Sequence, residues 1–132
     1  MKGKFVHDAD VDREQLDWGG LGWISRPSST GAQQLTVLDV TLEPGHGHDF
    51  HLHPDQEEVI VVQTGEIEQW LEGETSVLGP GEAVFVGRGT VHASFNTGRE
   101  TARLTVALAP CAGEGGYEIV DVSGEEPWRS LR

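Results

Sequence analysis

Residues 45–65 read GHGHDFHLHPDQEEVIVVQTG and residues 81–96 read GEAVFVGRGTVHASFN, and these two glycine-framed segments decide the fold. One residue separates His51 from His53, so in an extended strand both imidazoles leave from the same face and converge. A further histidine and a glutamate complete a mixed nitrogen and oxygen set, which suits one divalent transition metal such as Zn, Fe, Ni or Mn. The predicted metal ligands are His51, His53, Glu58 and His92.

The spacing within the first segment resembles the first motif of the cupin superfamily. That motif has a glycine, a His-x-His pair five residues later, then a glutamate and, after six more residues, a glycine. The matching residues are Gly45, His51, His53, Glu58 and Gly65. Glu57 is a competing carboxylate, but only Glu58 leaves six residues before Gly65.

The second segment resembles the second cupin motif. Its matching residues are Gly81, Gly89, His92 and Asn96. One position departs, because Gly87 stands where the family has proline. Losing the fixed φ makes this turn costlier to order by roughly 0.5–1 kcal/mol, but it removes no ligand.

The resemblance covers residues 35–110 and implies an all-β fold, the cupin β-barrel or jelly roll. It also implies that the metal lies in the mouth of the barrel. We expect one domain over residues 1–132, with a short N-terminal arm (1–20) and a C-terminal tail (123–132). The 18 glycines and 6 prolines, which separate short apolar runs, fit this all-β expectation.

Composition limits the partners and the compartment. No apolar run approaches the ~20 residues of a membrane span, and Lys4 is not followed by the apolar stretch that a secretory signal requires. We therefore expect a cytoplasmic protein with no membrane partner. Cys111 is the single cysteine, which excludes an internal disulfide. The net charge of −13 would repel a phosphate backbone, so nucleic-acid binding is not expected.

The family resemblance also implies a homodimer. Val59, Val61 and Trp70 are predicted to face outward and are too apolar to be left in water. We therefore expect these residues near a dimer interface or under the N-terminal arm. The other expected partner is a small-molecule ligand or substrate.

Turn residues divide the chain into predicted strands. A helical turn is possible at 12–16, and the four tryptophans are interpreted as packing residues rather than stacking platforms. The predicted strands are 21–27, 34–43, 57–63, 66–71, 82–86, 92–96, 103–109 and 117–122.

A two-residue turn at Thr64-Gly65 would join the third and fourth of these strands as a hairpin. Residues that share the side of Glu58 would then face the interior, as would residues two and four positions after His92. The predicted pocket residues are Ile60, Val62, Ile67, Gln69, Ser94 and Asn96, with Leu71 beside them. His46 and His48 have the opposite parity if the strand has no bulge, so they are assigned to the rim.

Four protein ligands leave one or two open positions on the metal for a substrate oxygen, a water or O₂. The segments near the predicted metal contain no additional strong acid or base, since Tyr117 lies near the tail and no lysine follows Lys4. The leading hypothesis is a metalloenzyme for a small oxygenated metabolite, of the dioxygenase, isomerase, cyclase or lyase type, with its catalytic residues unassigned. The alternative is a non-catalytic protein in which the metal holds a ligand or stabilises the barrel.

Overall fold

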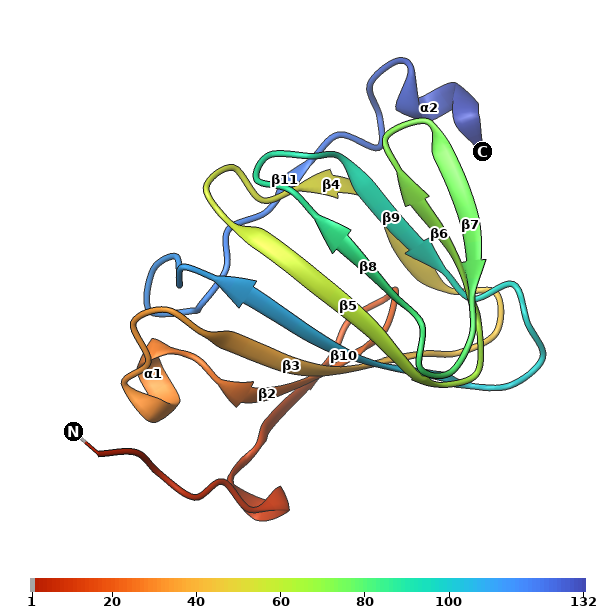
Figure 1. The fold of residues 1–132 in the computed structure, drawn as a ribbon. Helices are drawn as coiled ribbons and strands as arrows, with labels where there is room; N and C mark the ends of the chain where they lie inside the picture. The colour runs from red at the N-terminus through yellow and green to blue at the C-terminus, as the bar shows by residue number, and fades with distance from the viewer. Residues whose placement is uncertain (1) are drawn as a thin grey trace.

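The computed structural model describes residues 2–132, which fold into two antiparallel sheets that face each other (Figure 1). The six-stranded sheet has the order β1-β2-β3-β10-β5-β8, and the five-stranded sheet has the order β11-β4-β9-β6-β7. The predicted all-β fold is therefore confirmed. The strands are β1 (Asp12–Gln15), β2 (Gly20–Ser25), β3 (Thr36–Leu42), β4 (Gly47–Leu52), β5 (Glu57–Thr64), β6 (Ile67–Leu71), β7 (Glu74–Leu78), β8 (Ala83–Val86), β9 (His92–Phe95), β10 (Ala102–Ala109) and β11 (Val120–Asp121).

The helical elements are short. A 3-10 turn, η1, covers Asp8–Asp10, and the two α-helices are α1 (Pro27–Thr30) and α2 (Trp128–Leu131). Among residues 2–132, no helix has the length and apolar character that crossing a membrane requires.

The main core fills the space between the sheets. Residues of β10 alternate between buried and more exposed positions, as expected of a strand with one face in a core. Burying each large apolar side chain contributes about 1.5–3 kcal/mol relative to leaving it in water. The largest fully buried members of this core are Leu38, Leu42, Ile67, Leu104 and Leu108, each at most 2% exposed.

The hairpin predicted at Thr64-Gly65 is wrong. β5 pairs with β10 and β8, whereas β6 pairs with β7 and β9, so the chain changes sheets at this turn. The predicted inward side is nevertheless right, because Ile60, Val62 and Ile67 are all buried. Side-chain parity is a local property of a strand, while the choice of neighbouring strand depends on the whole fold.

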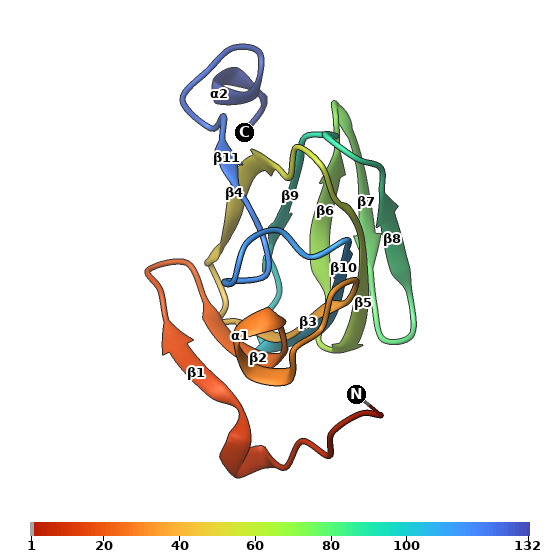
Figure 2. The same ribbon diagram turned by 90° about the vertical axis from the view of Figure 1, so that its left-hand side faces the viewer.

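The N-terminal region also differs from the sequence prediction. Residues 12–16 do not form a helical turn, because β1 pairs along β2 at the edge of the six-stranded sheet (Figure 2). The indole Nε1 of Trp23 donates a hydrogen bond of 2.8 Å to Glu14, which fixes this pairing. Cross-strand contacts therefore override the local helical preference. Strand β7 (Glu74–Leu78) was not predicted from the sequence.

A second apolar cluster lies on the other face of the five-stranded sheet, under the C-terminal segment. Phe50 packs against Trp70 and Trp128, with ring centroids 5.5 and 5.7 Å apart. The chain's own C-terminus, rather than the N-terminal arm, therefore covers the Trp70 side chain. Val59 is 37% exposed, and the homodimer expected through this residue stays a prediction.

Candidate metal centre and pocket

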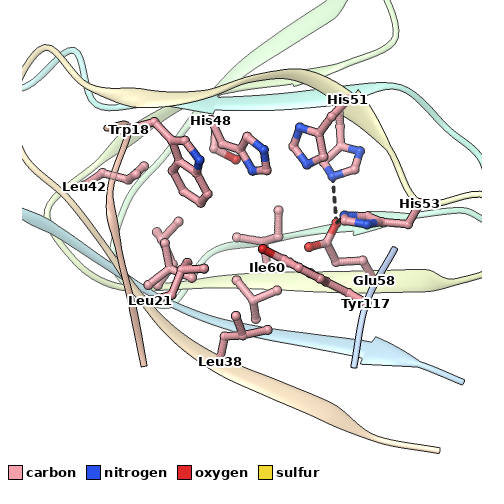
Figure 3. A pocket seen from close by; sticks show the side chains of 15 residues that line it. Trp18, Leu21, Leu38, Leu42, His48, His51, His53, Glu58, Ile60 and Tyr117 are labelled. Carbon is pink, nitrogen blue, oxygen red and sulfur yellow. Dashed lines mark ion pairs between the residues drawn. The ribbon is translucent and has the colours of Figure 1, made fainter. Parts of the chain in front are cut away.

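The four predicted metal ligands meet between the two sheets. His51 lies in β4 opposite His92 in β9, because these antiparallel strands place the two residues as register partners. His53 follows the end of β4, and Glu58 reaches the same point from β5 in the facing sheet. All four side chains are buried, and Figure 3 shows His51, His53 and Glu58 pointing toward one another. The structure thus brings the predicted ligands together, and metal binding itself stays a prediction.

Backbone carbonyls orient the three imidazoles. The Nδ1 atoms of His51, His53 and His92 lie 2.7, 2.8 and 3.0 Å from the carbonyl oxygens of Asp49, Glu118 and Thr90, respectively. A carbonyl oxygen accepts only, so each Nδ1 carries the hydrogen and each neutral ring keeps a lone pair on Nε2. The three histidines offer ligand atoms within 4.8 Å of one another. This arrangement is the one that metal-binding histidines usually adopt.

The unpaired atoms at the centre fit a bound cation. The Nε2 atoms of His53 and His92 and Oε1 of Glu58 are buried without a properly aligned hydrogen bond. Nevertheless, Nε2 of His92 lies 2.7 Å and Nε2 of His53 lies 3.5 Å from that carboxylate oxygen. Two lone pairs this close repel unless a proton or a metal lies between them. Three imidazoles and one carboxylate form a donor set suited to a divalent transition metal.

Electrostatics within the cluster keep the carboxylate ionised. Burial acts to raise the pKa of Glu58, but the close approach of His53 and His92 outweighs it and lowers that pKa below its usual range. Burial acts to lower the pKa of His92, but its contact with Glu58 outweighs that effect and raises it. Burial, followed by repulsion from His48 and the other two histidines, lowers the pKa of His51. A neutral His51 and an ionised Glu58 are the forms that a metal requires.

His48 does not lie on the rim, as the sequence analysis predicted, but lines the cavity. The register of β4 against β9 shifts between His48 and His51, and this irregularity breaks the simple alternation of side chains. The His48 ring stacks on His51 at 3.6 Å and on Trp18 at 4.0 Å. Burial, followed by repulsion from His92 and His53, lowers the pKa of His48 to about 3, so this imidazole is neutral. His46, by contrast, is exposed and agrees with the prediction.

Apolar side chains line the rest of the cavity, away from the histidines (Figure 3). They come from the six-stranded sheet and from the turn between β1 and β2. The turn contributes Trp18, which packs against the core, as predicted for the tryptophans, and also lines the cavity. The strands contribute Leu21, Leu38, Val40, Leu42, Ile60, Leu104 and Val106.

The segment between β10 and β11 also contributes Tyr117 to the cavity, although the sequence analysis placed it away from the metal. Its ring lies 5.7 Å from that of His53 and forms an edge contact of 4.9 Å with Trp23. Burial is the main cause that raises the pKa of Tyr117 to about 12, so the phenol stays protonated at neutral pH. A lone tyrosine next to a glycine gives no spacing signal, so the sequence alone could not have found it.

The six predicted pocket residues have different roles. Ile60 and Ser94 line the cavity, while Val62 and Ile67 belong to the core. Gln69 is buried and accepts a 2.6 Å hydrogen bond from the Ser94 hydroxyl. The remaining one, Asn96, holds a turn, because its Nδ2 donates to the carbonyls of Leu42 and Glu100. Leu71 is half-buried and lies outside the lining.

Two facing sheets with a histidine and glutamate cluster between them define a jelly roll with a candidate metal site. In agreement, residues 38–108 match the family described as the cupin domain, and the chain belongs to this family.

Several similar proteins are connected with polyketides. The polyketide synthase CurC of Streptomyces cyaneus is 27% identical over 121 residues, which cover 92% of this chain and 79% of that protein. The tetracenomycin polyketide synthase protein TcmJ of Streptomyces glaucescens is 33% identical over 86 residues, or 65% of this chain and 58% of that protein. Among solved structures, the polyketide cyclase RemF from Streptomyces resistomycificus is 27% identical, with a TM-score of 0.72, and the match covers 96% of this chain and 90% of that chain.

Proposed function

We propose that this protein is a metal-dependent cyclase that closes a ring in a polyketide intermediate. The observation that carries the proposal is the apolar cavity with the Nε2 cluster at one end, in a chain similar to a polyketide cyclase over 96% of its length. A polyketide intermediate is rich in carbonyl and hydroxyl oxygens. The proposal therefore selects the cyclase type among the reactions that the sequence left open.

The cavity suits ring closure by an aldol-type reaction. In this reaction a bond forms between the carbon next to one carbonyl and the carbon of a second carbonyl. The first carbon loses a proton, and the oxygen of the second carbonyl becomes a hydroxyl. The protein's contribution is to hold the flexible chain folded and to exclude water. Leu21, Leu38 and Leu104 supply the apolar surface, and the rings of Trp18 and His48 offer flat faces for stacking.

The metal-site residues would act on the oxygen atoms of the substrate. His51, His53, Glu58 and His92 would hold a divalent ion, which when bound supplies Lewis-acid chemistry that polarises a carbonyl. The backbone carbonyls of Asp49, Glu118 and Thr90 keep the three rings in the orientation that this role requires. Loss of these supports typically lowers metal affinity or activity about 10–100-fold.

Trp18 controls the size of the cavity. The space inside is about 40 Å³, which is room for a few water molecules only. The other side of Trp18 borders a second hollow, of about 90 Å³, which is also lined by Gln15, Thr41 and His46. A polyketide would therefore fit only when the Trp18 ring moves and joins the two spaces. The turn that carries Trp18 follows β1, an edge strand, and movement of the ring would break its stacking on His48.

Co-expression with a polyketide synthase that releases a partly cyclised chain would test the proposal. We expect products with an additional closed ring, identified by mass spectrometry and NMR, and we expect His92→Ala to abolish them. Identical products with and without the protein, when the purified protein is shown to hold metal, would overturn the cyclase proposal. Tight binding of the polyketide without turnover would instead support the alternative, a ligand-binding cupin.

A further inference from the structure

The hydroxyl of Tyr117 is an unused hydrogen-bond donor inside the cavity. Figure 3 shows the ring reaching past Glu58 with its hydroxyl pointing into the cavity. The His53 ring stacks on the Tyr117 ring, and Trp23 forms an edge contact with it. These two contacts fix the direction of the Tyr117 ring. Within residues 2–132, the Tyr117 hydroxyl forms no hydrogen bond and is not fully enclosed by protein atoms, so a ligand in the cavity can reach it.

The backbone on both sides of Tyr117 is fastened to the metal-site segment. The buried amide of Gln56 donates to the carbonyl of Gly116 at 3.0 Å and accepts from the backbone N–H of Glu118 at 3.1 Å. The Glu118 carbonyl in turn accepts the hydrogen bond from Nδ1 of His53. Thr36 adds a second donor to Gly116, at 2.8 Å. Tyr117 is therefore a preorganised donor, whose ordering costs little when a ligand binds.

Several other polar groups of the lining already have partners or a different role, whereas the Trp18 indole and the His48 ring, like Tyr117, form no hydrogen bond within residues 2–132. The Ser94 hydroxyl donates to Gln69 at 2.6 Å, and the Nδ1 atoms of the metal-site histidines donate to carbonyls. Their Nε2 atoms carry lone pairs and do not donate. The phenol of Tyr117 is thus suited to an acceptor that enters with the ligand.

We infer that Tyr117 donates a hydrogen bond to a carbonyl oxygen of the ligand and so fixes how a ketone-bearing aromatic molecule lies in the cavity. This inference rests on the proposed function, because it assumes that the cavity takes such a molecule. Tyr117 then determines which carbonyl faces away from the metal-site histidines and which one approaches them. Its role is selection and positioning of the ligand.

Two ligands of similar shape test the inference in the metal-containing protein. 2-Acetylnaphthalene carries a ketone, and 2-isopropylnaphthalene replaces it with a hydrocarbon group. The dissociation constants of both are measured by tryptophan quenching for the wild type and for Tyr117→Phe. We expect the preference for the ketone, expressed as the ratio of the two constants, to fall about 3- to 10-fold in Tyr117→Phe. Contributions from the metal and from ring packing are common to both proteins and cancel in this comparison.

Ser76→Ala is the matched control, because it removes a hydroxyl from an exposed residue that lies outside the cavity. Its ketone preference should equal that of the wild type. The Tyr117→Phe variant should fold normally, since the deleted hydroxyl has no partner within the chain, and thermal unfolding checks this. An unchanged ratio in Tyr117→Phe would overturn the inference alone. Failure of the wild type to bind either naphthalene would overturn the inference and the proposed function together.

Discussion

The two ends of the cavity are built in opposite ways. At the metal end, three imidazoles and a carboxylate occupy fixed positions, and each imidazole is oriented by a backbone carbonyl. At the other end, leucines and valines from β2, β3 and β10 supply apolar surface. The candidate metal end therefore depends on hydrogen-bond geometry, whereas the apolar end depends on packing, so substitutions at the two ends should have different effects.

Loss of one metal-ligating histidine should have the largest effect on metal binding and should show that this binding depends on the metal end of the cavity. Wild-type protein purified without a His tag is expected to carry about one divalent metal per chain. In His51→Ala the metal affinity should fall at least ~100-fold, because a ligand matters more than the groups that support it. Elemental analysis and metal titration measure both quantities.

His46→Ala provides the control for this experiment, since His46 is an exposed histidine outside the cavity. Its metal content should match that of the wild type. Full metal occupancy in a His51→Ala/His53→Ala double variant would show that the ion is not bound at this centre.

At the apolar end, Leu104→Ala should lower the free energy of unfolding by about 2–4 kcal/mol. The substitution removes a side chain that is only 2% exposed and leaves an empty space in the core. Its metal content should not change. The control is Val77→Ala, at a residue that is 60% exposed, where the change should stay within about 0.5 kcal/mol. Chemical denaturation and elemental analysis test both variants. If Leu104→Ala lost metal as severely as His51→Ala, the two ends would not be independent.

Removal of the metal should lower the thermal stability of the protein only at a pH at which the metal is bound. Metal requires neutral imidazoles, and protonation of histidine competes with it below a pKa of about 6.5. A chelator should therefore lower the melting temperature by roughly 5–10 °C at pH 7.5 and change it little near pH 5. Equal melting temperatures with and without chelator at pH 7.5, in protein first shown to contain metal, would mean that the ion does not stabilise the fold.

The smallest expected effect concerns His48, which lies at the junction of the two ends. Its pKa is about 3 in the folded protein, so below pH 6.5 the unfolded chain takes up a proton that the folded chain does not. This contribution to stability is complete above pH 6.5 and is lost as the pH falls toward 3. In chelator-treated protein, His48→Phe should reduce the loss between pH 7 and pH 5 by about 1–2 kcal/mol. Denaturation curves that fall equally steeply with pH in both proteins would contradict this.

The sequence by itself determined the family, the all-β class and the four residues that converge between the sheets. The reason is that spacing and parity are local: His51 and His53 share a face in any extended strand, and the alternation in β5 buries Ile60 and Val62 whichever strand lies beside it. For the same reason, the inward faces of β5 and β6 were predicted correctly from a hairpin that does not exist.

Only the tertiary structure decided the rest of the pocket. His48 enters the cavity because the register of β4 against β9 shifts, and no spacing within the sequence reports such a shift. Trp18 arrives from a turn next to an edge strand. Tyr117 lies on a loop that hydrogen bonds from Gln56 and His53 hold in place across 60 and 65 positions of the chain, respectively. These placements depend on contacts between residues far apart in the sequence, and such contacts are set by the packing of the whole chain.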